Sequence, residues 1–325
     1  MLARADSADP PLSFAPTAPS FPAWARAKNP PETDAEAAFL AGAALSRLDA
    51  IVRENPPWAG VWRRRLALRA ADASVLRAGR TEDEAALRDA FHLTRPGADP
   101  GPAGRRLLAW RELVGRSSGQ WRCAIAVAAE ALNIPRDEAL QEAIEAAEAC
   151  AAGPRLASFA AARAYQLARR ALTPAAGRSA AGEGELIAAW LADAVLAEKL
   201  KWPFALPLLA AALFSGAGRR ESDLADGAET TRVLFAYARA AAQACDLSAD
   251  LGRRAKKLHA VAPKLRAKGA GAALRALLDD DSLSAATKIG AQISERGARR
   301  LFDRLVALGA IRELTGRSTF RLYGL

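Results

Sequence analysis

Histidine and cysteine are scarce in this chain of 325 residues, which has two histidines and three cysteines. His92 and His259 have no further metal-binding residues at ligand spacing, and Cys123, Cys150 and Cys245 are too far apart to resemble a zinc site or a disulfide framework. Few, unpaired cysteines are typical of a reducing compartment. The sequence therefore predicts no metal site and a protein of the cytoplasm.

Sequence motifs of the common enzyme classes are also missing. We find no dinucleotide fingerprint, nucleophile elbow or kinase motif set. Four glutamates form a run at 138, 142, 145 and 148, but their spacing puts most of them on one exposed side of a helix, with no histidine nearby in the sequence. We therefore expect no catalytic residues and no cofactor, and interpret the protein as a non-enzyme.

The chain lacks a long apolar run. Its longest, Pro203 to Phe214, contains two prolines and is too short to span a bilayer. The N-terminus carries Asp6, Asp9 and many prolines but no apolar segment of the kind found in secretory signals. No membrane partner is predicted.

Positive charge is concentrated at one end of the chain. The formal net charge is +10, and residues 253–325 hold 16 Lys and Arg against 6 Asp and Glu, whereas the rest of the chain is balanced. A neutral body with one basic end indicates a localised site for a polyanion. A membrane surface is the competing polyanion, but the basic segment has the pattern of a compact domain rather than of a single amphipathic helix.

The pattern from Ser294 to Gly309 predicts a helix with one apolar and one basic side. Residues 298, 301, 302, 305 and 308 are apolar and share one face, while most of the charged residues take the other. Ser294 is a suitable N-cap, and Gly309 lies where a left-handed C-terminal cap would fall. Residues 311–314 and 319–323 alternate around Thr315 to Ser318, which predicts a hairpin with a glycine turn.

Upstream of this helix, residues 272–278 and 284–291 have the patterns of two short helices. Three helices followed by a basic hairpin predict a winged helix-turn-helix domain. In this motif the second helix enters the major groove of duplex DNA, while residues of the hairpin contact phosphates. We predict DNA contacts from Ser294, Arg296, Arg299, Arg300, Arg304, Arg317 and Arg321.

The fold expected for the whole chain is mainly α, with three parts. Residues 1–33 contain seven prolines and are expected to be a disordered arm, in which Phe14, Phe21 and Trp24 dock on the body. Residues 34–262 are expected to form an all-helical bundle, and residues 263–325 the winged-helix domain. Within the bundle we expect Thr33 or Asp34 to cap a first helix that packs antiparallel against a second, Ala59 to about Arg77.

Further local patterns predict several features of the bundle. Thr81 to Glu84 resembles a capping box, and the acidic residues from Glu82 to Asp89 are expected to pair with Arg63, Arg64, Arg65 and Arg69. Residues 173–185 read as a flexible loop, and 248–265 as a link to the terminal domain. Residues 202–214 are expected to be a buried, apolar helix at the centre of the bundle.

A glycine- and proline-rich loop lies between residues 92 and 106. Arg95, Gly97, Gly101, Gly104 and Arg105 could cradle a phosphate at the start of the following helix. No strand precedes the loop and its spacing matches neither common phosphate-loop motif. We therefore favour a structural turn over a phosphate site.

Several stretches resemble a bacterial family of unknown function, domain of unknown function 1403. They are Ala38 to Leu45, Trp58 to Leu68, Gly79 to Ala90, Arg95 to Arg105 and Arg312 to Leu325. The terminal stretch is also similar to winged-helix modules of Fic-type and plasmid-associated bacterial proteins. These resemblances imply no known activity, and point only to a role in plasmid maintenance or regulation.

Together these patterns lead to one main hypothesis and one alternative. The first is a regulatory or genome-maintenance protein of the nucleoid that binds duplex DNA through its C-terminal domain, while the body binds a protein partner or a second copy. The alternative is a non-enzymatic subunit of a segregation- or condensation-type assembly, whose winged helix holds a protein instead of DNA.

Overall fold

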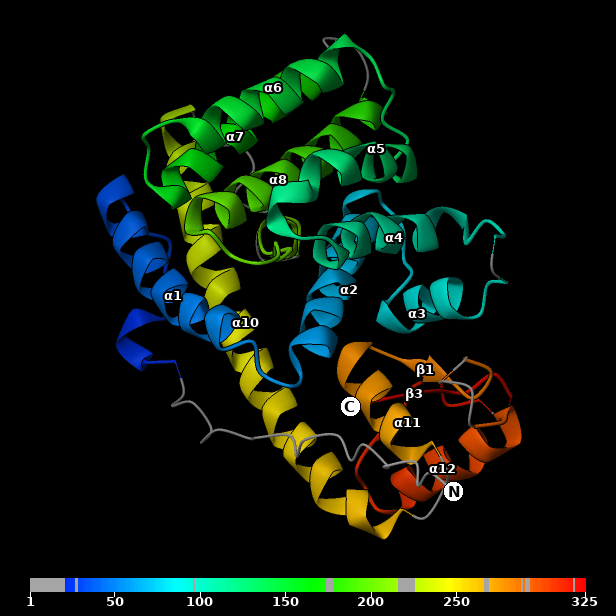
Figure 1. Ribbon diagram of the computed structural model, residues 1–325. Coiled ribbons are helices and arrows are strands. Elements are labelled where there is room, and N and C mark those ends of the chain that lie inside the picture. The colour runs from blue at the N-terminus through cyan, green and yellow to red at the C-terminus, as the bar shows by residue number, and fades with distance from the viewer. Residues whose placement is uncertain are drawn as a thin grey trace, which may run out of the picture.

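The computed structural model describes residues 21–26, 29–95, 97–173, 178–215, 226–265, 269–287, 289, 293–317 and 319–325, with backbone alone at 178–181 and 226–228. The described chain is mainly helical, as predicted (Figure 1). Its longer helices are α1 (Asp34–Glu54), α2 (Ala59–Arg77), α3 (Glu84–His92), α4 (Gly101–Gly115), α5 (Trp121–Ala131), α6 (Glu138–Ala152), α7 (Ala157–Leu172), α8 (Arg178–Leu200), α10 (Asp226–Val261), α11 (Ala270–Asp279) and α12 (Glu295–Ala307). Short helical turns are η1 (Ala23–Ala25), η2 (Ser118–Gln120), α9 (Leu209–Leu213) and η4 (Ala262–Lys264).

The core of the body lies around α8. Between Leu186 and Ala197 every side chain of this helix is buried, because α7, α6 and α5 cover it from the upper part of the molecule in Figure 1. Trp190 is fully buried and donates its indole N–H to the carbonyl of Ala109, 3.2 Å away. Residues 173–185 were expected to be a loop, but α8 already begins at Arg178, and residues 174–177 lie outside the described part.

The buried segment after α8 differs from the expected helix. Residues 202–208 are irregular and, apart from the exposed Pro203, buried, and only Leu209–Leu213 form a short helix. Pro203 and Pro207 explain the difference, because proline cannot donate a helical backbone hydrogen bond and also restricts the residue before it. The carboxylate of Asp193 on α8 accepts hydrogen bonds from the amides of Leu208 and Leu209, at 2.8 and 3.1 Å.

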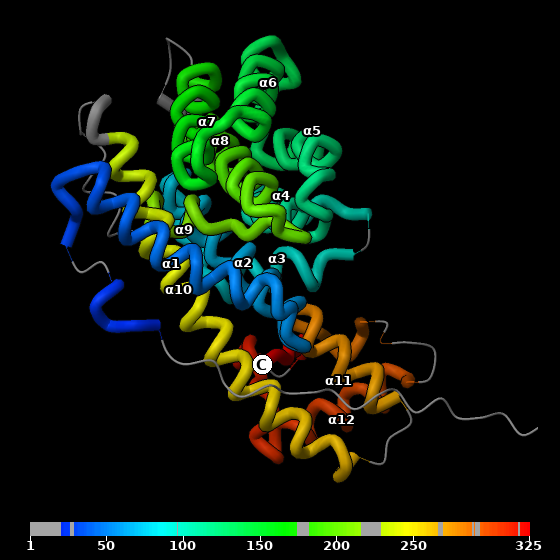
Figure 2. The backbone as a smooth tube through the Cα atoms, turned by 60° about the vertical axis from the view of Figure 1, so that its left-hand side comes forward, coloured from blue at the N-terminus to red at the C-terminus, as the bar shows by residue number. Residues whose placement is uncertain are grey.

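The long helix α10 connects the body to the C-terminal part. It has 36 residues and continues through 248–261, where the sequence predicted a separate link. Figures 1 and 2 show α1 alongside the upper part of α10, and α11 and α12 beside its lower end. The predicted antiparallel pair of α1 and α2 is therefore wrong, because α1 packs mainly on α10.

The N-terminal end of α1 shows where local patterns succeed and fail. Thr33 is the N-cap, and its hydroxyl accepts from the amide of Glu36 at 3.2 Å. The inward face carries Leu45 and Leu48, whereas Phe39 is 64% exposed and a Cβ added at Gly42 would meet nothing within 4 Å. At α3 the cap is Asp83 instead of Thr81, because its carboxylate accepts from the amide of Ala86.

Part of the expected disordered arm is packed on the body. Phe21 is buried in the core, and Arg26 forms an ion pair with Asp246 of α10 at 2.8 Å. Trp24 remains 69% exposed and lies against Phe39, with 6.1 Å between ring centroids. Residues 1–20, with Phe14, lie outside the described part of the chain.

The C-terminal part consists of α11, α12 and a small antiparallel sheet. Strands β1 (Leu283–Ser284), β2 (Arg312–Glu313) and β3 (Leu322–Gly324) are arranged in the order β1-β3-β2. The hairpin of β2 and β3 is confirmed, with Glu313 opposite Tyr323. The helix expected from Ser284 is wrong at 284–287, because Ser284 pairs with Leu322 and a turn follows, closed by the amide of Thr287. Residues 288 and 290–292 lie outside the described part.

Candidate nucleic-acid interface

Helix α12 is fixed in place by its ends and by its apolar face. The Ser294 hydroxyl accepts from the amide of Gly297 at 3.2 Å, and Gly309 has a φ of 62°, as a left-handed cap requires. Phe302 is fully buried, and the centroid of its ring lies 4.9 Å from the ring centroid of Tyr323 on β3. The inward residues are Ala298, Leu301, Phe302 and Leu305. This packing sets which residues of α12 face solvent.

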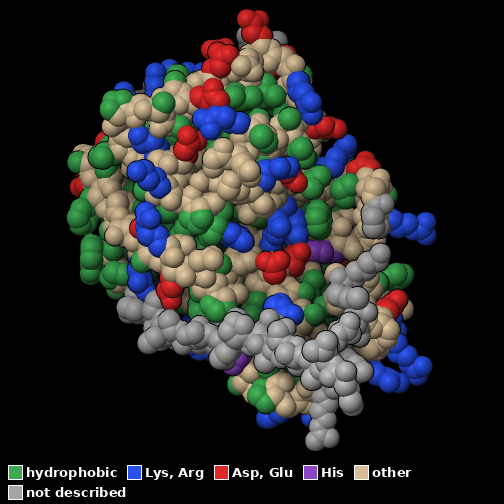
Figure 3. Space-filling view, in the orientation of Figure 1, with side chains coloured by type: hydrophobic (Ala, Val, Ile, Leu, Met, Phe, Trp, Pro, Cys, Tyr) green, Lys and Arg blue, Asp and Glu red, His purple; other side chains and the backbone are tan. Residues whose placement is uncertain are grey.

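Three predicted DNA-contacting arginines form a row on the exposed side of α12. Arg296, Arg300 and Arg304 follow one another at four-residue spacing, so they lie along one side of the helix. All three are exposed, and none forms an ion pair with another described residue. Figure 3 shows Lys and Arg side chains projecting at the lower right edge of the molecule, where Figure 1 places α12. Their charge is therefore open to solvent.

Two further candidates have weak partners at the surface. Arg299 lies 3.3 Å from Glu295, and both side chains are about two-thirds exposed. Arg321 donates to the carbonyl of Arg317 at 2.9 Å and lies 3.8 Å from Asp303, which also accepts from the Tyr323 hydroxyl at 3.4 Å. Exposed pairs of this kind contribute little free energy, on the order of 0–1 kcal/mol. Neither arginine is held strongly enough to be unavailable to a phosphate.

Arg317 has a stronger attachment. It lies at the hairpin turn and forms an ion pair with Asp89 of α3, whose carboxylate is mostly buried. The turn itself is closed by the Glu313 carboxylate, which accepts from the amides of Thr315 and Gly316 at 2.8 and 3.0 Å. Partial burial opposes the charge of Glu313, but these hydrogen bonds hold its pKa below the ordinary value. Arg317 was predicted to contact DNA, whereas here it holds the hairpin turn to the body.

The junction between body and C-terminal part is an ion-pair cluster that the sequence analysis missed. Asp281 is almost fully buried and lies between Arg65 of α2 and Arg88 of α3, the latter at 2.6 Å. Asp280 forms a bidentate pair with Arg111 of α4 at 2.7 and 2.9 Å. We call Asp280, Asp281, Arg65, Arg88 and Arg111 the aspartate clamp. Burial would raise the pKa of both aspartates, but the arginines outweigh it and hold each pKa below its ordinary value.

The clamp also corrects the expected partners of the basic residues in α2. Arg65 pairs with Asp281 instead of the acidic run from Glu82 to Asp89. Glu84 pairs with Arg88 at 3.1 Å. The prediction of internal ion pairs was therefore right in kind, but the partner of Arg65 lies far away in sequence, where spacing gives no signal. The two consecutive aspartates after α11 were the only available hint.

The loop from residue 92 to 106, for which a structural turn was favoured over a phosphate site, is closed by its own carboxylate. Asp99 accepts from the amide of Gly101 at 2.9 Å and lies 3.8 Å from Arg105. Gly97 and Gly101 have positive φ values, and Gly104 lets α4 approach the backbone of α3, since a Cβ there would lie 3.3 Å from the carbonyl of Ala90. Arg95 is exposed. These contacts account for the glycines as parts of a turn and a helix contact.

Cysteine and histidine side chains are placed apart from one another. Cys123 is exposed, while burial raises the pKa of the buried Cys245 thiol to about 12. Burial also lowers the pKa of His92, which lies beside the aspartate clamp. In the described ranges no group of three or more His, Cys, Asp or Glu side chains is arranged to hold a metal ion.

Among the helices that the structure describes, none combines the length and apolar character needed to cross a membrane.

Comparison with known proteins identifies the family. No curated protein matches the chain. The sequence model of one family, described as "Protein of unknown function (DUF1403)", matches residues 11–325 and so spans nearly the whole chain. The chain therefore belongs to the DUF1403 family.

Proposed function

We propose that the protein binds duplex DNA through the exposed side of α12, and that residues 270–324 form a winged helix. The order helix, strand, helix, strand, strand supports the second part, as does the position of β3 between β1 and β2. In such a domain α12 would be the recognition helix, entering the major groove with its first turns. The hairpin of β2 and β3 would be the wing.

One observation carries the proposal: the row formed by Arg296, Arg300 and Arg304 is exposed and has no carboxylate partner among the described residues. Arginines of the body such as Arg65, Arg88 and Arg111 are used in the aspartate clamp. Positive charge that is not used internally attracts a polyanion and releases counterions from DNA on binding. Arg299 and Arg321 would add further phosphate contacts once they leave their weak surface pairs.

We propose a smaller set of DNA contacts than the one predicted from the sequence. Ser294 caps α12, and Arg317 is paired with Asp89, so these two would position the helix and the wing. Arg296, Arg300 and Arg304 would supply the main contacts. A regulatory or genome-maintenance role in the nucleoid, including plasmid maintenance, remains part of this proposal.

The proposal is tested by the affinity of the full chain for a random duplex in a fluorescence-anisotropy titration. We expect Arg296→Ala plus Arg300→Ala to weaken binding by on the order of tenfold or more at moderate salt. The matched control is Arg136→Ala plus Arg155→Ala, which removes the same charge from exposed arginines around α6. Equal affinities of the α12 variant and the control would refute the proposal.

The alternative, in which the C-terminal part holds another protein, is favoured by Phe320. This residue in the hairpin loop is 74% exposed, and a large exposed apolar side chain suits a protein contact better than a phosphate contact. A Phe320→Ser variant of the full chain separates the two ideas. If the Phe320→Ser variant binds DNA as tightly as the wild type, DNA binding by α12 is supported. If the wild type binds no DNA and the variant loses a protein that co-purifies with the wild type, the alternative is supported.

A further inference from the structure

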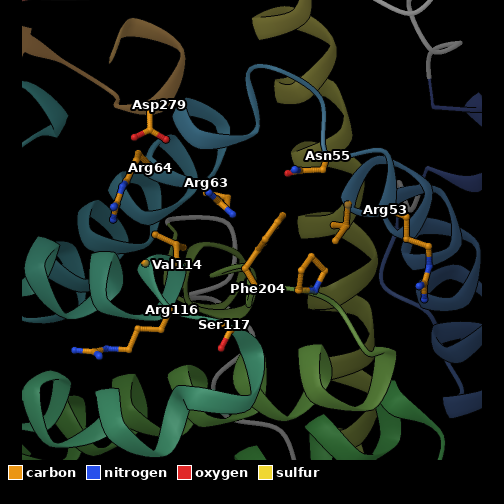
Figure 4. A pocket seen from close by; sticks show the side chains of 12 residues that line it. Arg53, Asn55, Arg63, Arg64, Val114, Arg116, Ser117, Phe204 and Asp279 are labelled. Carbon is orange, nitrogen blue, oxygen red and sulfur yellow. The ribbon is translucent and has the colours of Figure 1, made fainter. Parts of the chain in front are cut away.

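A basic pocket lies on the body, away from the exposed side of α12. Its volume is about 710 Å³, and it is bounded by the end of α1, the first turns of α2, the end of α4 and the irregular segment after α8 (Figure 4). The end of α11 closes one side with Asp279. Four arginines line the pocket against this single carboxylate; they are Arg53, Arg63, Arg64 and Arg116.

Two of these arginines are already satisfied by neighbours. Arg53 pairs with Asp49 at 2.7 Å and also donates to the carbonyl of Leu200. Arg116 pairs with Glu112 one helical turn away, at 3.0 Å. In Figure 4 both side chains extend outward from the middle of the pocket. They contribute to the local potential but need no further partner.

Arg63 and Arg64 are different, because neither has an ion pair among the described residues. The Arg63 guanidinium lies over the ring of Phe204, 4.1 Å from its centroid, and Arg64 donates to the carbonyl of Arg111 at 3.2 Å. Both are partly buried, and this burial lowers the pKa of each guanidinium. Asp279 favours the charge of Arg63, and Asp280 and Asp279 favour that of Arg64, but neither aspartate forms an ion pair with Arg63 or Arg64, and Asp280 is paired with Arg111. Partly buried cations without an anion in contact are costly to a fold.

We propose that this pocket binds a small phosphate-bearing molecule, whose phosphate group is held by Arg63 and Arg64. Guanidinium groups match phosphate oxygens in pairs. Contact with the Phe204 ring fixes the position of the Arg63 side chain, and the hydrogen bond to the Arg111 carbonyl fixes that of Arg64. Ser117 and Asn55 add a hydroxyl and an amide to the lining. The volume falls in the usual range for small-molecule sites and leaves room for an organic portion beside the phosphate.

The site does not depend on DNA binding by α12, since none of its lining residues belongs to that helix. It does touch both parts of the molecule, because Asp279 directly precedes the aspartate clamp. A ligand there would contact the body and the end of α11 together.

Isothermal titration of the full chain with inorganic pyrophosphate, at constant ionic strength, tests the site. We expect saturable binding by the wild type, at least tenfold weaker binding by Arg63→Gln and by Arg64→Gln, and intermediate binding by Arg63→Lys. The control is Arg239→Gln on α10, because Arg239 is also a half-buried arginine over a phenylalanine ring, that of Phe235 at 5.8 Å. Its affinity should equal that of the wild type.

The α12 variant Arg296→Ala plus Arg300→Ala separates this site from the DNA-binding surface. Retained pyrophosphate binding by that variant supports the pocket, whether or not its DNA affinity has fallen. The proposal is overturned if the wild type shows no saturable binding, if binding is lost only in the α12 variant, or if Arg63→Gln and Arg64→Gln both bind as tightly as the wild type.

Discussion

At the residue scale, Asp193 shows how one buried polar side chain supports an irregular segment. Its carboxylate accepts from two backbone amides, those of Leu208 and Leu209, which begin the short helix α9. Without it these amides would be buried and unpaired, and each would lose its hydrogen bond to water on folding. Burial raises the pKa of Asp193 well above the ordinary value, although its hydrogen bonds to the amides of Leu208 and Leu209 act in the opposite direction.

We expect Asp193→Ala to lower the free energy of unfolding by about 2–4 kcal/mol, because it removes both acceptors. Asp193→Asn keeps one acceptor oxygen and should cost less, about 1 kcal/mol. Since the pKa is raised on folding, the contribution of Asp193 is largest at low pH and is lost as pH rises through the folded-state pKa. Urea unfolding of the three proteins across pH measures this, and an Asn variant as unstable as the Ala variant would contradict the capping role.

At the element scale, the contact between the α1–α2 turn and α10 depends on one glycine. Gly252 lies in α10 beneath the Trp58 ring, and a Cβ there would lie 2.8 Å from the ring. The Trp58 indole also donates to the Ser248 hydroxyl one turn earlier, at 3.1 Å. Gly42, in α1, has nothing within 4 Å of an added Cβ. The same residue type therefore has different roles in the two helices.

Replacement of each glycine by alanine should have opposite effects. Gly42→Ala gains helix propensity without a clash and should stabilise the protein by about 0.5–1 kcal/mol. Gly252→Ala gains the same propensity but displaces Trp58, and should destabilise by about 1–3 kcal/mol. Thermal unfolding of the two variants beside the wild type measures the difference. If both variants were more stable than the wild type by the same amount, Trp58 would not pack on α10 as described.

Helix ends could be predicted from sequence because the interactions that fix them are local. The hydroxyls of Thr33 and Ser294 each accept from the amide three residues later, at the start of α1 and α12. Gly309 ends α12 because its backbone takes the left-handed conformation. Which helices pack against each other could not be predicted from the sequence, since α1 packs on α10 and these segments lie about two hundred residues apart. The strand at Leu283–Ser284 was missed for the same reason: the strand with which it pairs, β3, comes from the last residues of the chain.

In the candidate site, too, the features set by local spacing could be predicted from the sequence and those set by distant residues could not. The outward row of Arg296, Arg300 and Arg304 followed from helical spacing alone. Whether an arginine is free or paired depends on distant carboxylates, so the attachment of Arg317 to Asp89 gave no signal in the sequence. The pocket around Arg63 and Arg64 likewise forms only when five separate segments meet.

At the scale of the whole molecule, the aspartate clamp joins the C-terminal part to the body. Asp281 contacts arginines from α2 and α3, and Asp280 one from α4. Gly60 allows the close approach of α2, because a Cβ there would lie 2.6 Å from the Cα of Asp279. Buried carboxylates with several charge-assisted hydrogen bonds hold their partners firmly, and removing one partner leaves the others uncompensated.

We expect Asp281→Asn to cost about 3–5 kcal/mol, because Arg65 and Arg88 would be left without their anion. The exposed control Asp303→Asn should cost less than about 1 kcal/mol. The pKa values of Asp280 and Asp281 are lowered by folding, so the clamp contributes fully above the ordinary aspartate pKa and weakens as pH falls through the folded-state values. As the pH is lowered, the amide exchange rate in α11 should increase at a higher pH than the rate in α8. If both rates increased at the same pH, the clamp would not open separately from the body.

The central claim is that the open arginine row of α12 contacts DNA phosphates, and counterion release measures those contacts directly. The measurement is the slope of log K against log salt concentration for a random duplex, with the wild type and with Arg296→Ala plus Arg300→Ala plus Arg304→Ala. If the row contacts phosphates, the slope should become shallower by about one for each arginine removed. An unchanged slope in a variant that is still folded would contradict the claim.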